Sequence, residues 1–132
     1  MAAADRPLVK PRPIYLNLFA IRQPVPAIIS ILHRVSGVLL ILVGIPVLLW
    51  FVDASLASPE RYSGAYGALT SWFGRLVLLA LAWSVFHHVL AGIRHLLLDI
   101  HLGLDLAPAR RSAAIVLVVA LLLTLACAVR LW

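Results

Sequence analysis

Three long apolar stretches separated by polar segments dominate the pattern of this chain. The first predicted helix covers about residues 27–52, and its 18 residues from Val35 to Val52 carry no charge. As a helix they span roughly 27 Å, close to the hydrocarbon thickness of a bilayer. The second helix is predicted at about 71–99 and the third at about 112–130. The pattern predicts an all-α integral membrane protein, with one three-helix anchor over residues 27–132.

The polar segments predict where these helices end. Residues 1–26 contain five prolines, which oppose a long helix, so we expect an extended amino-terminal arm. Residues 53–70 are rich in serine and glycine and predict a loop. A short turn around Gly103 and Pro108 precedes the third helix, and Pro46 is expected to kink the first.

Composition and charge support a membrane protein and set its orientation. The chain is 64% hydrophobic and 12% charged, with a mean hydropathy of +1.06, too apolar for a small soluble core to bury. The net charge of +6 comes from basic residues that flank the apolar stretches, which indicates membrane orientation rather than a nucleic-acid partner. Four basic residues lie in the arm, so we expect the amino terminus in the cytoplasm and the carboxyl terminus outside. The lone Cys127 is expected to be a small buried apolar residue.

Polar residues inside two of the apolar stretches are the candidates for chemistry. Residues 86–99 read FHHVLAGIRHLLLD and place three histidines, an arginine and an aspartate where hydrocarbon disfavours them. At helical spacing one stripe of this helix contains Ser84, His88, Ala91, Gly92, His95 and Asp99. A matching stripe on the first helix contains Ser30, His33, Arg34, Gly37, Ile41 and Gly44. We expect the two stripes to face protein or a ligand rather than lipid.

Depth in the membrane suggests which ligand these stripes suit. His33 and Arg34 lie about 10 Å inside the cytoplasmic end, whereas His88 lies about 16 Å from Asp99. The arrangement suits a haem with iron at His88 and with its propionates near the cationic residues Arg34, His33, Arg94 or His95.

Spacing alone leaves simpler readings open. His88 fits equally well as a hydrogen-bonding partner of a neighbouring helix, and His87, about 100° away around the helix, fits a structural role. Arg94 and Asp99 fit residues that reach out to the membrane surface.

Two motifs resemble one protein family. The sequence SILHRVSG at residues 30–37 and HVLAGIRHL at 88–96, followed by Asp99, is similar to the cytochrome b membrane-anchor subunit of bacterial succinate dehydrogenase, respiratory complex II. The resemblance covers nearly the whole chain. It implies a multi-pass protein of the bacterial inner membrane that pairs with a second small anchor subunit. Together the two anchors would hold a flavoprotein subunit and an iron–sulfur subunit on the cytoplasmic face.

The resemblance also implies cofactors and site residues. One haem b would lie between the two anchors with His88 as its axial ligand here, although the doubled histidine leaves His87 as the other choice. The helix stripe and the spacing to Gly92 and His95 favour His88. The ubiquinone site would include Ser30 and Arg34. The haem propionates would lie near His33, Arg34 and His95, with Arg94 and Asp99 as further candidates.

Two other functions fit the same features. A fumarate reductase anchor would share the topology and the quinone chemistry, with electrons moving in the opposite direction. A helix-packing or transport subunit without redox chemistry would use the same polar stripes without a cofactor. In each case the chain has no flavin, iron–sulfur or succinate site, so we expect it not to be an enzyme by itself.

Overall fold

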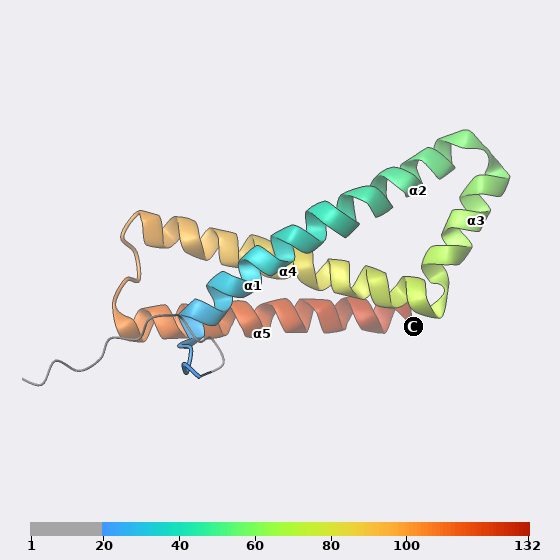
Figure 1. Ribbon diagram of the computed structural model, residues 1–132. Helices are drawn as coiled ribbons and strands as arrows, with labels where there is room; N and C mark the ends of the chain where they lie inside the picture. The colour runs from blue at the N-terminus through green and yellow to red at the C-terminus, as the bar shows by residue number, and fades with distance from the viewer. Residues whose placement is uncertain (1–19) are drawn as a thin grey trace, which may run out of the picture.

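The computed structural model describes residues 20–132, so most of the predicted amino-terminal arm lies outside the described residues. The described part is mostly helical and contains no strand (Figure 1). Its elements are α1 (Val25–Leu39), the π-helical turn η1 (Leu40–Gly44), α2 (Ile45–Ala57), α3 (Pro59–Thr70), α4 (Trp72–Asp99) and α5 (Leu106–Leu131).

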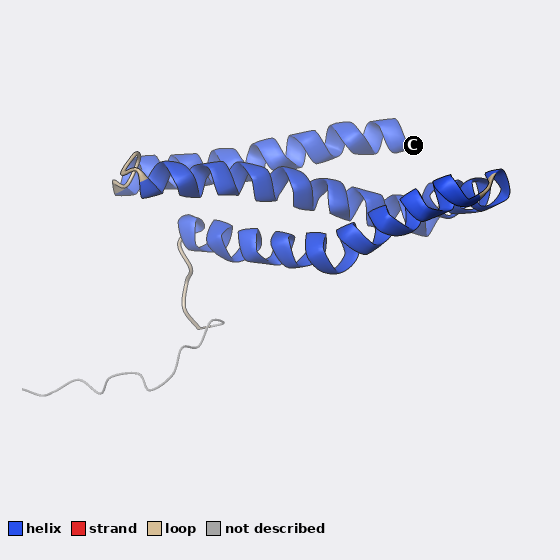
Figure 2. Ribbon diagram, turned by 90° about the horizontal axis from the view of Figure 1, so that it is seen from above, coloured by secondary structure: helices blue, strands red, loops and turns tan. Residues whose placement is uncertain are grey.

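Together α1, η1 and α2 form one continuous rod from Val25 to Ala57. Its 33 residues extend about 50 Å, well beyond the 27–52 predicted. In place of a simple kink at Pro46, the chain makes a π turn just before it, where the Ile45 N–H donates to the Leu40 carbonyl. A π turn of this kind accommodates a proline that cannot donate to the preceding turn. Figure 2 shows the rod changing direction along its length.

The loop predicted at 53–70 is wrong, because α2 continues to Ala57 and α3 fills Pro59–Thr70. The Ser58 hydroxyl accepts a hydrogen bond from the Arg61 N–H at 3.2 Å, and Pro59 occupies the first helical position. This serine cap followed by proline is a helix-start signal that outweighs the two glycines of the segment. An ion pair from Arg61 to Asp53 at 2.9 Å ties α3 back to α2.

The other two spans pack as an antiparallel pair, and α1 crosses α4 (Figure 1). The second span, α4, matches the predicted range 71–99 closely. The third span, α5, begins six residues before the predicted residue 112, because Pro108 is tolerated in the first turn of a helix. Small side chains let the helices approach, with a buried cluster of Ile29, Ala91, Ala113 and Val116. The carboxyl terminus returns to the start of α4, where the rings of Trp72 and Trp132 meet edge to face.

The outer surface of the bundle is apolar. Three helical stretches are long and apolar enough to cross a membrane: Val25–Ala57, Trp72–Asp99 and Leu106–Leu131. Large apolar side chains point outward on all of them, for example Leu42, Val89 and Leu122. Such a surface is stable in lipid and not in water, which agrees with the predicted three-span membrane protein.

The corner between α3 and α4 depends on a glycine, and we predict that Gly74→Ala destabilises the protein. An added Cβ would overlap the Ala68 carbonyl oxygen and lie 2.6 Å from that of Leu69. Backbone atoms cannot yield, so we expect a loss of about 1–3 kcal/mol, measured as a lower melting temperature in detergent. Gly64→Ala is the matched control, because its Cβ would meet nothing within 4 Å. Equal effects of the two substitutions would contradict this role for Gly74.

Candidate functional site

Three of the predicted site residues lie side by side between α1 and α4. The ring of His33 stacks on that of His88, with centroids 4.1 Å apart and planes at 20°. His95, two turns further along α4, lies with its ring centroid 5.2 Å from that of His33. We call His33, His88 and His95 the histidine cluster. It joins the two polar stripes that the sequence placed on separate helices.

The hydrogen bonds of His88 determine which ring nitrogen is free. His88 Nδ1 lies 3.1 Å from the His33 carbonyl oxygen and 3.2 Å from Ser36 Oγ, and the Ser36 hydroxyl donates to the same carbonyl. Since a carbonyl only accepts, we assign the proton to Nδ1. The Nε2 atom then carries a lone pair, and it has no hydrogen-bond partner within residues 20–132. A histidine fixed in this way through Nδ1 is suited to bind a metal through Nε2.

Gly37 allows the His88 ring to come this close to α1. An added Cβ at Gly37 would lie 2.9 Å from His88 Cε1, shorter than a normal contact. At Gly92, on the facing helix, the corresponding atom would lie 3.5 Å from His33 Nε2, an ordinary contact. Sequence reasoning left Ser36 without a role, although its position one turn from His33 and inside the SILHRVSG motif was a usable signal.

His87 points in a different direction from His88. Its side chain is completely buried and stacks on Trp83, with centroids 5.2 Å apart and planes at 12°. Neither ring nitrogen has a hydrogen-bond partner among the described residues, although the ring lies near the Ile29 backbone without hydrogen-bond geometry. The buried face of α4 therefore contains His87 rather than His88, and the single stripe predicted on this helix divides into two faces about 100° apart.

Ser30 and Arg34 lie one turn apart on a flank of α1. Arg34 is exposed and Ser30 is half-buried, and neither makes a hydrogen bond within the part of the chain that the structure describes. Arg34 lies about 14 Å along α1 from Val25, inside a membrane span. An exposed charge at this depth is costly in lipid, so this flank requires a protein partner or a polar ligand.

Arg94 and Asp99 lie outside the histidine cluster. Arg94 is buried against α5, where its Nε donates to Ser112 Oγ at 3.0 Å and its Nη2 to the Ala109 carbonyl at 3.3 Å. Asp99 is exposed at the last position of α4. Both residues were predicted candidates for propionate contacts, but in the structure Arg94 points toward α5 and away from the histidine cluster.

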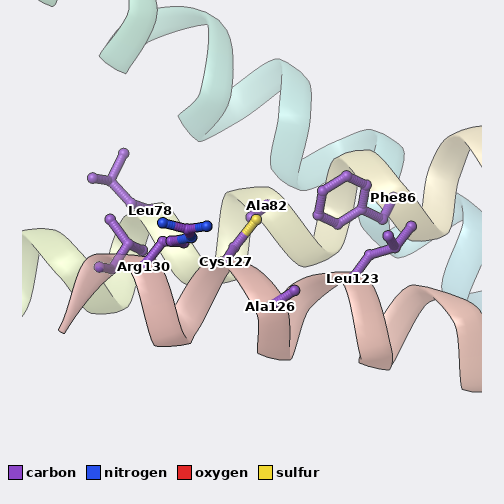
Figure 3. A pocket seen from close by; sticks show the side chains of 8 residues that line it. Leu78, Ala82, Phe86, Leu123, Ala126, Cys127 and Arg130 are labelled. Carbon is purple, nitrogen blue, oxygen red and sulfur yellow. The ribbon is translucent and has the colours of Figure 1, made fainter.

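A separate apolar cavity of about 570 Å³ lies between α4 and α5 near the carboxyl terminus. Figure 3 shows Phe86, Leu123 and Leu78 around it, with the Arg130 guanidinium near Leu78 and the partly buried Cys127 between them. None of the predicted site residues lines this cavity. Over residues 20–132 no group of three or more histidine, cysteine or acidic side chains is arranged to hold a metal ion.

We predict that Gly37→Ala destabilises the α1–α4 contact. The added methyl group would push the His88 ring away from the His33 carbonyl and Ser36, at a cost of about 1–3 kcal/mol. A lower melting temperature of the purified protein in detergent would report this loss. The control is Gly92→Ala, whose methyl group meets only an ordinary contact, and an effect as large as that of Gly37→Ala would refute the prediction.

Comparisons with known proteins place this chain in a family. The family described as the succinate dehydrogenase/fumarate reductase transmembrane subunit matches residues 9–127. A succinate dehydrogenase cytochrome b556 subunit from Paracoccus denitrificans is 35% identical over 77% of this chain and 78% of its own length. Subunits of the same name from Coxiella burnetii (32% identical over 92% of this chain and 97% of its own) and Rickettsia prowazekii (29% over 95% and 97%) are also similar. With its three membrane-spanning helices, the chain belongs to the succinate dehydrogenase/fumarate reductase transmembrane subunit family, as a multi-pass protein of the bacterial inner membrane.

Proposed function

We propose that this chain is the haem b-binding membrane-anchor subunit of a succinate:quinone oxidoreductase. The observation that supports this most directly is the environment of His88, whose Nδ1 is held by the His33 carbonyl and whose Nε2 is free. Three relatives carry the name cytochrome b556, which agrees with a b-type haem.

Each residue of the histidine cluster has a proposed role in binding a haem. In the proposal, His88 would bind the haem iron through Nε2, and a second small anchor subunit would supply the other protein ligand. The His33 ring lies against both His88 and His95, and Arg34 follows His33 on α1, so these groups would neutralise the propionates. A haem bound there would supply a one-electron carrier within the membrane. The His87 ring is buried on another face of α4 against Trp83, so it is the less suited of the two histidines to bind such a ligand.

Ser30 and Arg34 are the proposed quinone-binding residues. They lie on the flank of α1 and make no hydrogen bond within residues 20–132, so the Ser30 hydroxyl and the Arg34 guanidinium could donate to a carbonyl oxygen of ubiquinone. The guanidinium would also stabilise the negative charge that develops on that oxygen as electrons arrive. The electrons come from succinate through a flavoprotein subunit and an iron–sulfur subunit.

The proposed assembly explains the exposed polar flank of α1. The second anchor and the iron–sulfur subunit would cover Arg34, which lipid alone would not accommodate. The amino terminus and the turn between α4 and α5, with Arg110 and Arg111, would face the cytoplasm, where basic residues are favoured. The carboxyl terminus would then lie outside.

A fumarate reductase anchor is the second candidate, because the matching family includes that enzyme. The assembled complex separates the two candidates. We expect succinate oxidation coupled to ubiquinone reduction to be faster than menaquinol oxidation coupled to fumarate reduction, and the reverse ratio would favour the second candidate.

The first prediction of this proposal concerns the axial ligand. His88→Leu removes the free Nε2, so the assembled complex should lose its haem b band or show it shifted in a reduced-minus-oxidised spectrum. His87→Leu is the matched control on the neighbouring residue, and it should leave the band intact, since neither nitrogen of the buried His87 ring has a hydrogen-bond partner among residues 20–132. The opposite result would move the ligand to His87. No haem band in the unsubstituted complex would favour a helix-packing or transport subunit.

The second prediction concerns the quinone site. Ser30→Ala and Arg34→Leu should each slow succinate-dependent ubiquinone reduction by at least about tenfold, since each removes a hydrogen bond to the quinone. Electron transfer from succinate to a soluble artificial acceptor should persist, because that reaction needs only the peripheral subunits. If both activities fall together, the substitutions act on assembly and the assignment fails.

A further inference from the structure

Arg94 is a buried cation that has no acidic partner among residues 20–132. Its side chain is only 5% exposed, and its two hydrogen bonds go to neutral acceptors, Ser112 Oγ and the Ala109 carbonyl. Across residues 20–132 a single ion pair forms, between Arg61 and Asp53, at the opposite end of the bundle (Figure 1). A guanidinium carries five N–H donors, so donors of Arg94 remain available.

The surroundings of Arg94 add positive charge instead of offsetting it. Ala109 lies in the first turns of α5, where the helix dipole is positive. Arg110 and Arg111 follow directly and are exposed. A buried cation is strongly unfavourable unless an anion or several polar groups compensate it. The local charge balance therefore calls for an anion from outside the described residues.

A cavity of about 240 Å³ beside Arg94 could bind this anion. Arg94 and Ser112 supply its polar lining, and its other walls are mainly apolar, from Leu97, Leu98, Leu102 and Pro108. Gly103, with a φ of +79°, helps to form the turn that borders it. The cavity lies at the end of two membrane spans, which is the depth of lipid headgroups. Its walls match a ligand with an anionic head and a hydrocarbon tail better than they match a small hydrated ion.

We propose that Arg94 and Ser112 bind the phosphate group of a membrane phospholipid, in the cavity where α4 turns into α5. The phosphate would accept from the unused donors of Arg94, and the acyl chain would cover the leucines of the cavity wall. This site is separate from the histidine cluster, because Arg94 and His88 lie on different faces of α4. It holds independently of the proposed haem and quinone functions.

The test uses the complete complex, purified in detergent and stripped of lipid. Phosphatidylglycerol is added, and binding is followed by native mass spectrometry and by the melting temperature. We expect Arg94→Gln to weaken phosphatidylglycerol binding at least about tenfold, since it removes a charge-assisted contact. Arg111→Gln is the matched control, because it removes the same charge from an exposed neighbouring position outside the cavity. Equal losses in both variants would mean unspecific attraction and would overturn the proposal.

Further measurements distinguish a bound phospholipid from free phosphate and from an acidic group of a partner subunit. Inorganic phosphate should raise the melting temperature far less than the lipid does, and an equal effect would show that no lipid tail is recognised. An unchanged affinity in Arg94→Gln, with a lower melting temperature, would assign the counter-ion to a partner subunit and overturn the proposal. Asp5 is the one acid of residues 1–19 and so the alternative counter-ion for Arg94 from that part of the chain. If Arg94→Gln loses lipid affinity and Asp5→Asn does not, the result supports the lipid site.

Two controls keep the result interpretable. If Arg94→Gln does not assemble, Leu102→Trp fills the cavity from an exposed position and should also reduce lipid binding, with Arg94 intact. Unchanged binding in that variant would overturn the cavity assignment. The reduced-minus-oxidised spectrum should be the same in Arg94→Gln as in the unsubstituted complex. Loss of a haem band in Arg94→Gln would assign Arg94 to a haem propionate instead.

Discussion

The hydrogen bond from His88 to the His33 carbonyl joins α1 to α4, and much of the bundle's organisation depends on it. Lipid tails are as apolar as leucine, so helices in a membrane gain little from hydrophobic burial and associate through close packing and polar contacts. Gly37 provides the close approach at this point, and Ser36 adds a second acceptor for the same ring. The bond therefore holds two helices together and fixes the orientation of an imidazole ring.

The central helix α4 carries two polar faces with different roles. One face directs His88 and His95 to α1, and the other directs Arg94 to Ser112 and Ala109 on α5. Within residues 20–132, the side-chain hydrogen bonds between membrane spans are made by His88, to α1, and by Arg94, to α5. Successive residues of a helix are rotated by about 100°, so the neighbours His87 and His88 lie on different faces of α4 and have different surroundings.

The sequence alone predicted the three spans and a polar stripe on two of them, because long uncharged stretches, and polar residues inside them, are clear signals in a membrane protein. It missed α3, since the serine, proline and glycines of residues 58–67 were read as loop residues when Ser58 and Pro59 in fact start a helix. The sequence also could not predict that Arg94 points toward α5. Spacing gives the angle of a residue around its own helix, whereas the position of α5 decides what that angle faces.

The π turn at Leu40–Gly44 has a consequence for the two halves of the first rod. A π turn contains one residue more than an α-helical turn, so it resets the angular register of all that follows it. The face of α1 that meets the histidine cluster therefore does not continue along α2. The residues before the turn contact the histidine cluster, whereas those after it carry Asp53, which pairs with Arg61. The extra residue of the π turn therefore separates two halves of one helix that face different neighbours.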